Sequence, residues 1–328
     1  MAMQFRTVID IKPFDRKIDH SSRILSLGSC FADNIARRMQ RAKFRVEASP
    51  TGILFNPESI ARAVERFAAA ESPAREELRH DGERYFGYDF HSAFADADPE
   101  RALAAMREAA RRGADALRRA DTVIITFGTA WIYRLRENGD VVANCHKQPQ
   151  SLFARELLAA DRIADRYAKL LEGPLADKHV IFTVSPVRHL GDGAERNSLS
   201  KAVLRVAVGE LASRFPDADY FPSFEIMNDE LRDYRFYADD MAHPSQTAVD
   251  YIWERFGATA LAESARRAAE RAERIAEAAE HRPFDPRGEA HRNFCRAMLR
   301  RIDELRREQP QMQFDDEKEY FNSFLEIN

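Results

Sequence analysis

Two short, continuous apolar runs constrain the fold of this chain more than any other feature. They span Asp121–Phe127 and His179–Ser185, and both are rich in β-branched residues. Strands that are apolar on both faces are typical of a parallel sheet that helices cover on both sides. We therefore expect both runs to be central strands of such a sheet.

Further strands and helices are predicted around these two runs. Short apolar segments indicate strands at Arg23–Leu27, Phe44–Ala48 and Asp219–Phe221. Helical spacing of apolar residues is found at residues 33–39, 57–70, 99–119, 151–171, 198–215 and 246–256. Alternation of strands and helices is typical of a doubly wound α/β fold, in which the carboxyl ends of the strands meet at one edge.

Two insertions interrupt this alternation, and we place both in a first domain over residues 1–257. The first, about residues 57–120, is far longer than an ordinary connection, so we expect a cap segment there. The second, about residues 131–145, contains Asn138-Gly139 between two apolar segments. Asn-Gly is a strong hairpin signal, and we therefore predict a hairpin at this point.

The remainder of the chain, residues 258–328, is predicted to be a helical tail. It is rich in Ala, Arg and Glu and forms one long helix to about Glu280, followed by Pro283 and Pro286. A second helix carries Phe294, Met298, Ile302 and Leu305 on one face. We favour packing of these helices along the main domain, and leave open a homodimer that forms through them.

Charge and cysteine content limit the classes of partner. The 328 residues carry a net charge of −4, which offers no basic excess for nucleic acid. The sequence contains no run of about 20 apolar residues, the length that a membrane-spanning helix needs, and its amino terminus lacks the pattern of a secretory signal. Three cysteines are too few for a disulfide framework, and no zinc-type spacing is present. We expect a cytoplasmic protein without metal or cofactor.

Ser29 is the first candidate for chemistry. It follows the first predicted strand directly and precedes a helix, where backbone N–H groups and the helix dipole favour negative charge. Serine is also a favoured residue for capping a helix, and that alternative stays open for Ser29. The neighbouring Cys30 could act as a nucleophile at the same place, but we expect its side chain to point into the core.

Asp240 and His243 form a second candidate group. They are three residues apart, immediately before a predicted helix, so one tight turn can bring the carboxylate and the imidazole together. Such a pair can remove the proton of a serine hydroxyl. The alternative is an aspartate that caps the turn beside an ordinary loop histidine.

Leu27-Gly28-Ser29-Cys30-Phe31-Ala32 resembles the motif that gives the GSCFA family its name, a family placed in the SGNH/GDSL hydrolase superfamily. Further segments that resemble this family are Phe127–Trp131, Asn144–Lys147, Ser185–His189, Phe221–Glu225 and the Asp-x-x-His turn. The resemblance covers about residues 20–257 and leaves the tail outside. It implies a three-layer, flavodoxin-like domain with Ser29 as nucleophile, His243 as general base and Asp240 as the residue that orients it.

The oxyanion site departs from the usual superfamily pattern. A Gly-x-Asn-Asp signature ordinarily follows the third strand, whereas here the sequence is Gly128-Thr129-Ala130-Trp131 and the asparagine is missing. The resemblance leaves the N–H groups of Ser29 and Gly52 as candidate donors. Candidate substitutes for the missing side chain are Asn56, Thr129 and Asn144. Loss of one donor lowers rates by about 10²–10³, so slow hydrolysis or acyl transfer is consistent with the sequence.

By the same resemblance, His146, His189, Arg188 and Lys147 are expected at the cleft, where Arg188 or Lys147 could meet an anionic group. Each is equally explained as a structural contact at a strand end. Cys145 and His146 are neighbours, and in a strand they would face opposite sides, which argues against a Cys–His dyad. The aromatic residues Tyr85, Phe86, Tyr88, Phe90 and Trp131 could stack on a sugar, although core packing is the commoner role.

These observations favour a serine esterase or O-acyltransferase that acts on acyl esters, with acetylated carbohydrates as the first substrate class to test. Ser29 would form the acyl-enzyme. The alternative is a non-catalytic protein that binds a glycan or acyl group, or acts as a scaffold, and the missing asparagine supports it. A metal hydrolase ranks third, because no His-x-x-x-His spacing is present.

Overall fold

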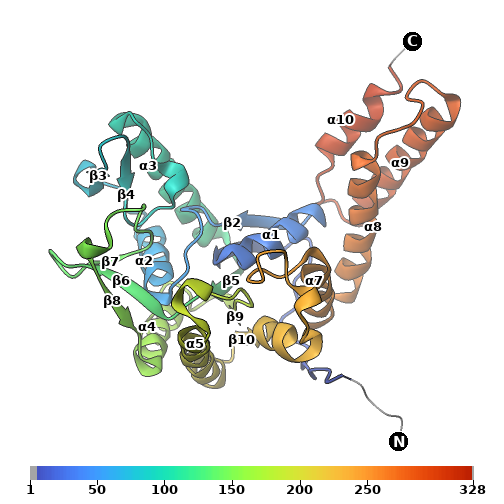
Figure 1. Ribbon diagram of the computed structural model, residues 1–328. Coiled ribbons are helices and arrows are strands. Elements are labelled where there is room, and N and C mark those ends of the chain that lie inside the picture. Colours follow the sequence, from blue (N-terminus) through green and yellow to red (C-terminus); the bar gives the residue numbers. More distant parts are fainter. Residues whose placement is uncertain (1–5, 327–328) are drawn as a thin grey trace, which may run out of the picture. The chain divides into compact units, whose positions relative to one another are not determined.

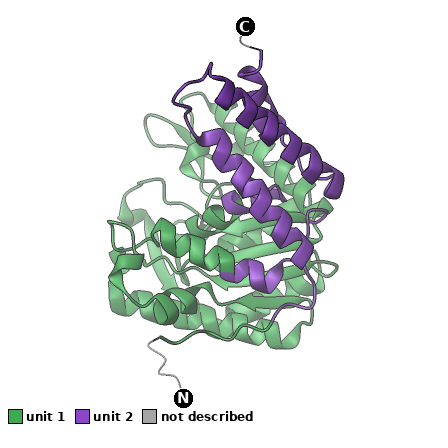
Figure 2. Cartoon of the chain, turned by 90° about the vertical axis from the view of Figure 1, so that its right-hand side faces the viewer, with its two compact units in different colours: residues 1–12, 23–36, 47–254 green, residues 13–22, 37–46, 255–328 purple. Residues whose placement is uncertain are grey.

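The computed structural model describes residues 6–326, which form two compact units (Figure 2). The first unit comprises residues 1–12, 23–36 and 47–254, and the second comprises residues 13–22, 37–46 and 255–328. The second unit therefore contains two amino-terminal segments that the sequence analysis assigned to the first domain. No helix among residues 6–326 has the length and apolar character that a membrane crossing requires.

The first unit is built on a five-stranded sheet with the order β10-β9-β5-β1-β2 (Figure 1). Its strands are β1 (Arg23–Gly28), β2 (Arg45–Ala48), β5 (Thr122–Phe127), β9 (His179–Val184) and β10 (Ala218–Phe221). The pairs β1–β5, β5–β9 and β9–β10 are parallel. Counted along the chain, this order is 2-1-3-4-5, which is the flavodoxin-like order, and the predicted α/β fold is confirmed.

Helices lie on both sides of this sheet (Figure 1). One layer contains α2 (Pro57–Ala68), α3 (Pro99–Arg119), α4 (Ala160–Glu172) and α5 (Ala194–Arg214). The opposite side carries α1 (Cys30–Arg41) and α7 (Gln246–Ala260). Every residue of β5 and β9 is buried, as their continuous apolar sequences predict.

Most of the segment that was predicted as a cap belongs to the helical layer. Helices α2 and α3 pack against each other, and α3 also contacts β1. Between them lies a short antiparallel hairpin of β3 (Leu78–His80) and β4 (Tyr85–Gly87). Phe86 and Phe90 are buried in the core, which is the commoner role for such aromatic residues, so these two rings are not exposed for stacking on a sugar.

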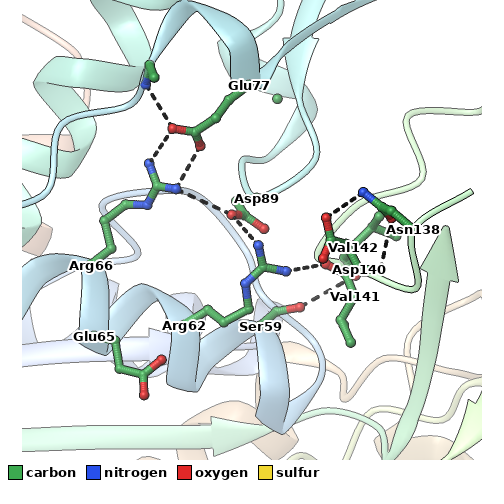
Figure 3. Close-up of polar contacts among 12 residues, drawn as sticks. Ser59, Arg62, Glu65, Arg66, Glu77, Asp89, Asn138, Asp140, Val141 and Val142 are labelled. Carbon is green, nitrogen blue, oxygen red and sulfur yellow. Dashed lines mark hydrogen bonds and ion pairs between the residues drawn. The ribbon is translucent and has the colours of Figure 1, made fainter.

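A partly buried ion network connects this hairpin region to α2 (Figure 3). The Arg66 guanidinium lies 2.7 Å from the Glu77 carboxylate and 3.5 Å from that of Asp89. Arg62 donates to Asp89 over 2.9 Å and also to the Val141 carbonyl. Burial raises the pKa of Asp89, and the two guanidinium groups oppose this rise. Through these two arginines the network connects α2 to three other parts of the chain, at Glu77, Asp89 and Val141.

A second, three-stranded antiparallel sheet has the order β7-β6-β8. Strands β6 (Trp131–Leu135) and β7 (Val141–Val142) form the predicted hairpin around Asn138-Gly139. Strand β8 (Phe153–Leu157) pairs with β6 along its whole length. The prediction of one helix over 151–171 is therefore wrong in its first part, because pairing with β6 draws these residues into a strand and α4 starts only at Ala160.

The carboxyl-terminal part of the second unit consists of α8 (Glu263–Glu280), α9 (Glu289–Glu308) and α10 (Asp315–Ser323). Residues of all three helices share one apolar cluster, to which Met298, Ile302 and Leu305 belong. The predicted single helix up to Glu280 is interrupted at Leu261 and Ala262, where the Ala262 N–H donates to the Ile18 carbonyl over 2.9 Å. A backbone pairing outside the helix therefore ends α7 before α8 begins.

Candidate active site at the carboxyl end of the parallel sheet

The turn after β1 depends on Gly28. Its φ of +139° is rarely adopted by residues with a side chain, and an added Cβ would lie 2.2 Å from the carbonyl oxygen of Thr126 in β5. The next N–H, that of Ser29, donates to the same carbonyl over 3.2 Å. The absence of a side chain at Gly28 therefore lets the ends of β1 and β5 approach, at the position where flavodoxin-like folds place their ligands.

Ser29 is buried at this turn, with 1% of its surface exposed. Its Oγ has no hydrogen-bond partner among the described residues, so its side chain does not cap α1. Cys30 is less buried and lines the adjacent pocket, contrary to the expectation that it points into the core. Burial raises the pKa of the Cys30 thiol, which lowers its thiolate fraction. Position alone therefore does not make Cys30 an activated nucleophile.

Asp240 and His243 lie in contact on the turn before α7, as their spacing predicts. Nδ1 of His243 is 2.6 Å from Oδ2 of Asp240, and Oδ1 of Asp240 accepts the N–H groups of His243 and Ala242, each over 2.9 Å. These backbone hydrogen bonds, first that of His243, lower the pKa of Asp240 to about 2. An ionised Asp240 holds the proton on Nδ1, which leaves Nε2 of the neutral imidazole as an acceptor.

A pocket of about 520 Å³ lies within the first unit, and neither Ser29 nor Asp240 is among its lining residues in the described chain. Its size is that of an ordinary small-molecule site. Both Cys30 and His243 line it. The other lining residues are Phe55, Asn56, Thr129, Trp131, Tyr133, Val142, Ala143, Asn144, Cys145, Arg155, Val187, Arg188, His189 and Asp192.

The pocket contains five of the eight residues that were predicted around the oxyanion and the substrate. These are Asn56, Thr129, Asn144, Arg188 and His189. Gly52, Gly128 and His146 are not among its lining residues in the described chain. The exposed Lys147 is also absent from the lining, so of the two predicted anion contacts only Arg188 reaches the pocket.

The two predicted backbone donors are already engaged. The Ser29 N–H donates to Thr126 as described, and the Gly52 N–H donates to the Ser49 carbonyl over 2.7 Å. Gly52 faces the His91 ring, since an added Cβ would lie 2.2 Å from the His91 Cβ. Neither N–H group can therefore donate to an oxyanion without first losing its hydrogen bond to a backbone carbonyl.

Two asparagine side chains offer alternative donors. Oδ1 of Asn56 accepts the Ser59 N–H over 2.8 Å, and Oδ1 of Asn144 accepts the His146 N–H over 2.7 Å. These bonds fix the orientation of both amides. No hydrogen bond within the described residues uses either amide NH₂ group, and both residues line the pocket. Thr129 is less available, because its Oγ1 contacts Ser200 Oγ at 3.0 Å and accepts the Trp131 N–H.

His146 and Cys145 do not form a catalytic pair. The His146 ring stacks on Phe86 with 4.2 Å between ring centroids, and its Nε2 is 3.1 Å from the Gly87 carbonyl. Burial lowers the pKa of His146, while burial raises that of Cys145 to about 11. Cys145 lines the pocket and His146 is packed in the core, so the two side chains have separate surroundings.

Lys201 was not predicted as a residue of the site, because it lies on the predicted helix 198–215, where a lysine is ordinarily solvated. Lys201 is 1% exposed, and its Nζ donates to the carbonyls of Gly128 and Ser185 over 2.6 and 2.7 Å. It thereby joins the segments that follow β5 and β9. Burial lowers its pKa to about 7. Burial, and then the Lys201 charge, also lowers the pKa of His189 to about 4, which leaves that imidazole neutral at pH 7.

We expect Lys201 to make folding stability depend on pH. Its pKa is about 7 in the folded protein against 10.5 ordinarily, so between these values only the unfolded chain binds the proton and the free energy of unfolding rises with pH. From pH 7 to pH 9 the difference between wild type and Lys201→Met should grow in favour of wild type by about 2 kcal/mol, measured by urea unfolding. Lys169→Met, at an exposed position, serves as the control. An equal pH response in both variants would contradict the burial argument.

The strand β8, which sequence analysis assigned to a helix, supplies Arg155 to the pocket. The Arg155 guanidinium lies 4.3 Å from the centre of the Trp131 ring and forms an ion pair with Asp192. Tyr133 is the second ring beside it, at 5.7 Å. The residues Phe153-Ala154-Arg155-Glu156-Leu157 do not alternate apolar and polar side chains, so the local sequence did not indicate a strand here.

The described residues contain no group of three or more His, Cys, Asp or Glu side chains that could hold a metal ion. The fold and site together define an α/β protein of flavodoxin-like strand order, with a pocket at the carboxyl edge of its sheet. The model of the GSCFA family matches residues 23–256, and the chain belongs to this family.

A second family model, described as the C-terminal domain of GSCFA domain proteins, matches residues 272–327. The likeness to the family therefore extends into the helical tail, which the sequence analysis had left outside it. No curated protein matches the chain.

Proposed function

We propose that this protein is a serine esterase or O-acyltransferase of the SGNH/GDSL hydrolase superfamily, and that it acts on acyl esters through an acyl-enzyme on Ser29. The observation that carries the proposal is the Ser29 hydroxyl, which is buried without a hydrogen-bond partner next to Cys30, a residue that lines the same pocket as His243. An unsatisfied buried hydroxyl costs about 1–3 kcal/mol, so a purely structural role gives no reason for a serine there. The Asp240–His243 contact supplies the base that such a nucleophile needs.

In the proposed reaction, Nε2 of His243 takes the proton of Ser29 Oγ as this oxygen attacks the acyl carbonyl. The tetrahedral intermediate collapses when the alcohol leaves with the proton from His243, and the acyl group stays on Ser29. Water or a hydroxyl of an acceptor then gives a proton to His243 and attacks the acyl-enzyme. The second tetrahedral intermediate collapses as the bond between the acyl carbon and Ser29 Oγ breaks, and Ser29 Oγ takes the proton back from His243, which restores the free enzyme. Asp240 stabilises the imidazolium throughout, because its carboxylate faces Nδ1.

The amide groups of Asn56 and Asn144 are the candidate donors for the oxyanion. Their oxygens are held by backbone N–H groups, so each amide is oriented before substrate binds. Ser29 also lies at the amino end of α1, where the helix dipole favours negative charge. These side chains would replace the asparagine that usually follows the third strand, whose position is occupied by Ala130 in this sequence.

A non-catalytic protein that binds a glycan or an acyl group is the second candidate. It is favoured by the N–H groups of Ser29 and Gly52, which both donate to backbone carbonyls. An oxyanion hole built on these two groups is therefore not preformed. The Asp240–His243 contact counts against this candidate, because binding alone does not require an oriented base.

A fluorophosphonate probe, read by intact mass and peptide mapping, separates the two candidates. We expect wild type to gain one phosphonyl group on Ser29 and Ser29→Ala to gain none. Cys30→Ala is the matched control at the neighbouring position and should be labelled like wild type. A folded wild type that stays unlabelled, or a label that maps to Cys30, would contradict the serine mechanism.

The cysteines support a reducing compartment as part of this proposal. Cys30, Cys145 and Cys295 are all free thiols. The reducing environment of the cytoplasm keeps such thiols reduced, and we therefore propose a cytoplasmic location.

A further inference from the structure

We propose that the pocket selects an acidic substrate, and that Arg188 binds a carboxylate or phosphate group of that substrate beside His243. The inference deepens the proposed function, since it names the substrate class of the same site. The recognition of an anion does not depend on catalysis, however, so the two can be tested separately.

The first argument is that the Arg188 guanidinium has no acidic partner. None of the ion pairs within residues 6–326 joins Arg188 to a carboxylate, and the one hydrogen bond that its side chain makes within these residues goes to the Met241 carbonyl over 3.2 Å. Arginine has five N–H donors, so most of them are left for a ligand. Because Arg188 lines the pocket, these donors can meet a bound molecule. Arginine binds carboxylate and phosphate oxygens especially well because two donors can act in parallel.

The second argument is that Arg188 is held in place before any ligand binds. Its guanidinium lies 5.4 Å from the centre of the Tyr237 ring and 5.9 Å from that of Tyr234. The backbone N–H of Arg188 donates to the Ala242 carbonyl over 3.0 Å. Arg188 therefore contacts the turn that carries His243, and an anion on Arg188 would lie close to the base.

The third argument is the charge balance of the other lining residues. The second arginine, Arg155, is neutralised by its ion pair with Asp192. His189 is neutral at pH 7, and Asp192 is the one acidic residue that lines the pocket in the described chain. Among the lining residues one positive charge thus remains uncompensated, since the nearby Asp240 carboxylate does not line the pocket and is in contact with His243. An ester without a negative group would leave this charge unpaired.

Isothermal titration calorimetry with the Ser29→Ala protein tests the inference without turnover. The probes are three matched sugars: glucose, which is neutral, glucuronate, which carries a carboxylate, and glucose 6-phosphate. We expect at least one of the two acidic sugars to bind ten-fold or more tightly than glucose. This preference should shrink when the salt concentration is raised from 50 to 500 mM.

Arg188→Gln should abolish the preference, and Arg188→Lys should retain part of it. Arg118→Gln removes the same charge from an exposed position on α3 and serves as the control. Tighter binding of glucuronate alone would indicate a carboxylate, and tighter binding of glucose 6-phosphate alone would indicate a phosphate. Equal or absent binding of all three sugars would overturn the inference, as would a preference that survives Arg188→Gln. Should that variant not fold, the comparison of sugars and its salt dependence still decide. Failure of phosphonate labelling would instead affect only the catalytic proposal.

Discussion

Replacement of Ser29 by alanine is expected to lower ester turnover by about 10⁴-fold or more while the protein stays folded. The variant lacks the oxygen that would form the acyl-enzyme. Its free energy of unfolding should stay the same or rise by about 1 kcal/mol, because the lost hydroxyl is buried without a partner. Hydrolysis of 4-nitrophenyl acetate and urea unfolding measure the two effects.

The sign of the stability change separates catalysis from capping. Loss of a capping serine would cost about 1 kcal/mol, the opposite of the change expected here.

Asp240→Asn should reduce turnover by about 10³–10⁴-fold because the imidazole loses its orienting carboxylate. Its exposed neighbour gives the control Asp239→Asn, which should leave turnover unchanged. Unaltered turnover in Ser29→Ala would end the serine mechanism.

Gly28→Ala is expected to cause the largest loss of stability, about 3–5 kcal/mol in urea unfolding. The new methyl group would lie 2.2 Å from the Thr126 carbonyl oxygen, and backbone cannot move aside as a flexible side chain does. The positive φ adds strain of its own. The pairing of β1 with β5 would therefore be disturbed at the candidate active site.

Gly139→Ala is the matched control for this prediction. Gly139 also has a positive φ, of +79°, but an added Cβ would meet no atom within 4 Å. Its loss of stability should therefore be only the conformational cost, about 1 kcal/mol. Equal losses in the two variants would show that φ, and not the approach of the two strands, sets the requirement for glycine at position 28.

The central fold could be predicted because its signals are local. β5 and β9 are apolar throughout, and Asn138-Gly139 specifies a hairpin turn without help from distant residues. Strand β8 could not be assigned in the same way. Its residues become a strand by pairing with β6, a contact between segments about 20 residues apart. The break between α7 and α8 has a similar cause, since it depends on a backbone bond to Ile18.

The candidate site shows the same difference between residues that local sequence predicts and residues that depend on distant contacts. Asp240 and His243 meet within one turn, and their contact follows from spacing alone. Lys201 and Arg155 enter the site from elements far along the chain, and nothing in their local sequence indicates a buried ammonium or a stacked guanidinium. Ser29 was predicted as a candidate residue, but its burial and the exposure of Cys30 to the pocket depend on how α1 starts at the edge of the sheet.

The walls of the pocket come from two separate sheets. Thr129 and Val187 follow strands β5 and β9 of the large parallel sheet, whereas Trp131, Tyr133 and Arg155 belong to the small antiparallel sheet. Mutations in the small sheet can therefore reshape recognition while the reactive edge keeps its geometry. Relatives that share this architecture can change what the pocket binds by exchanging a few side chains on β6 and β8, and in the proposed function recognition and the chemical step would diverge independently.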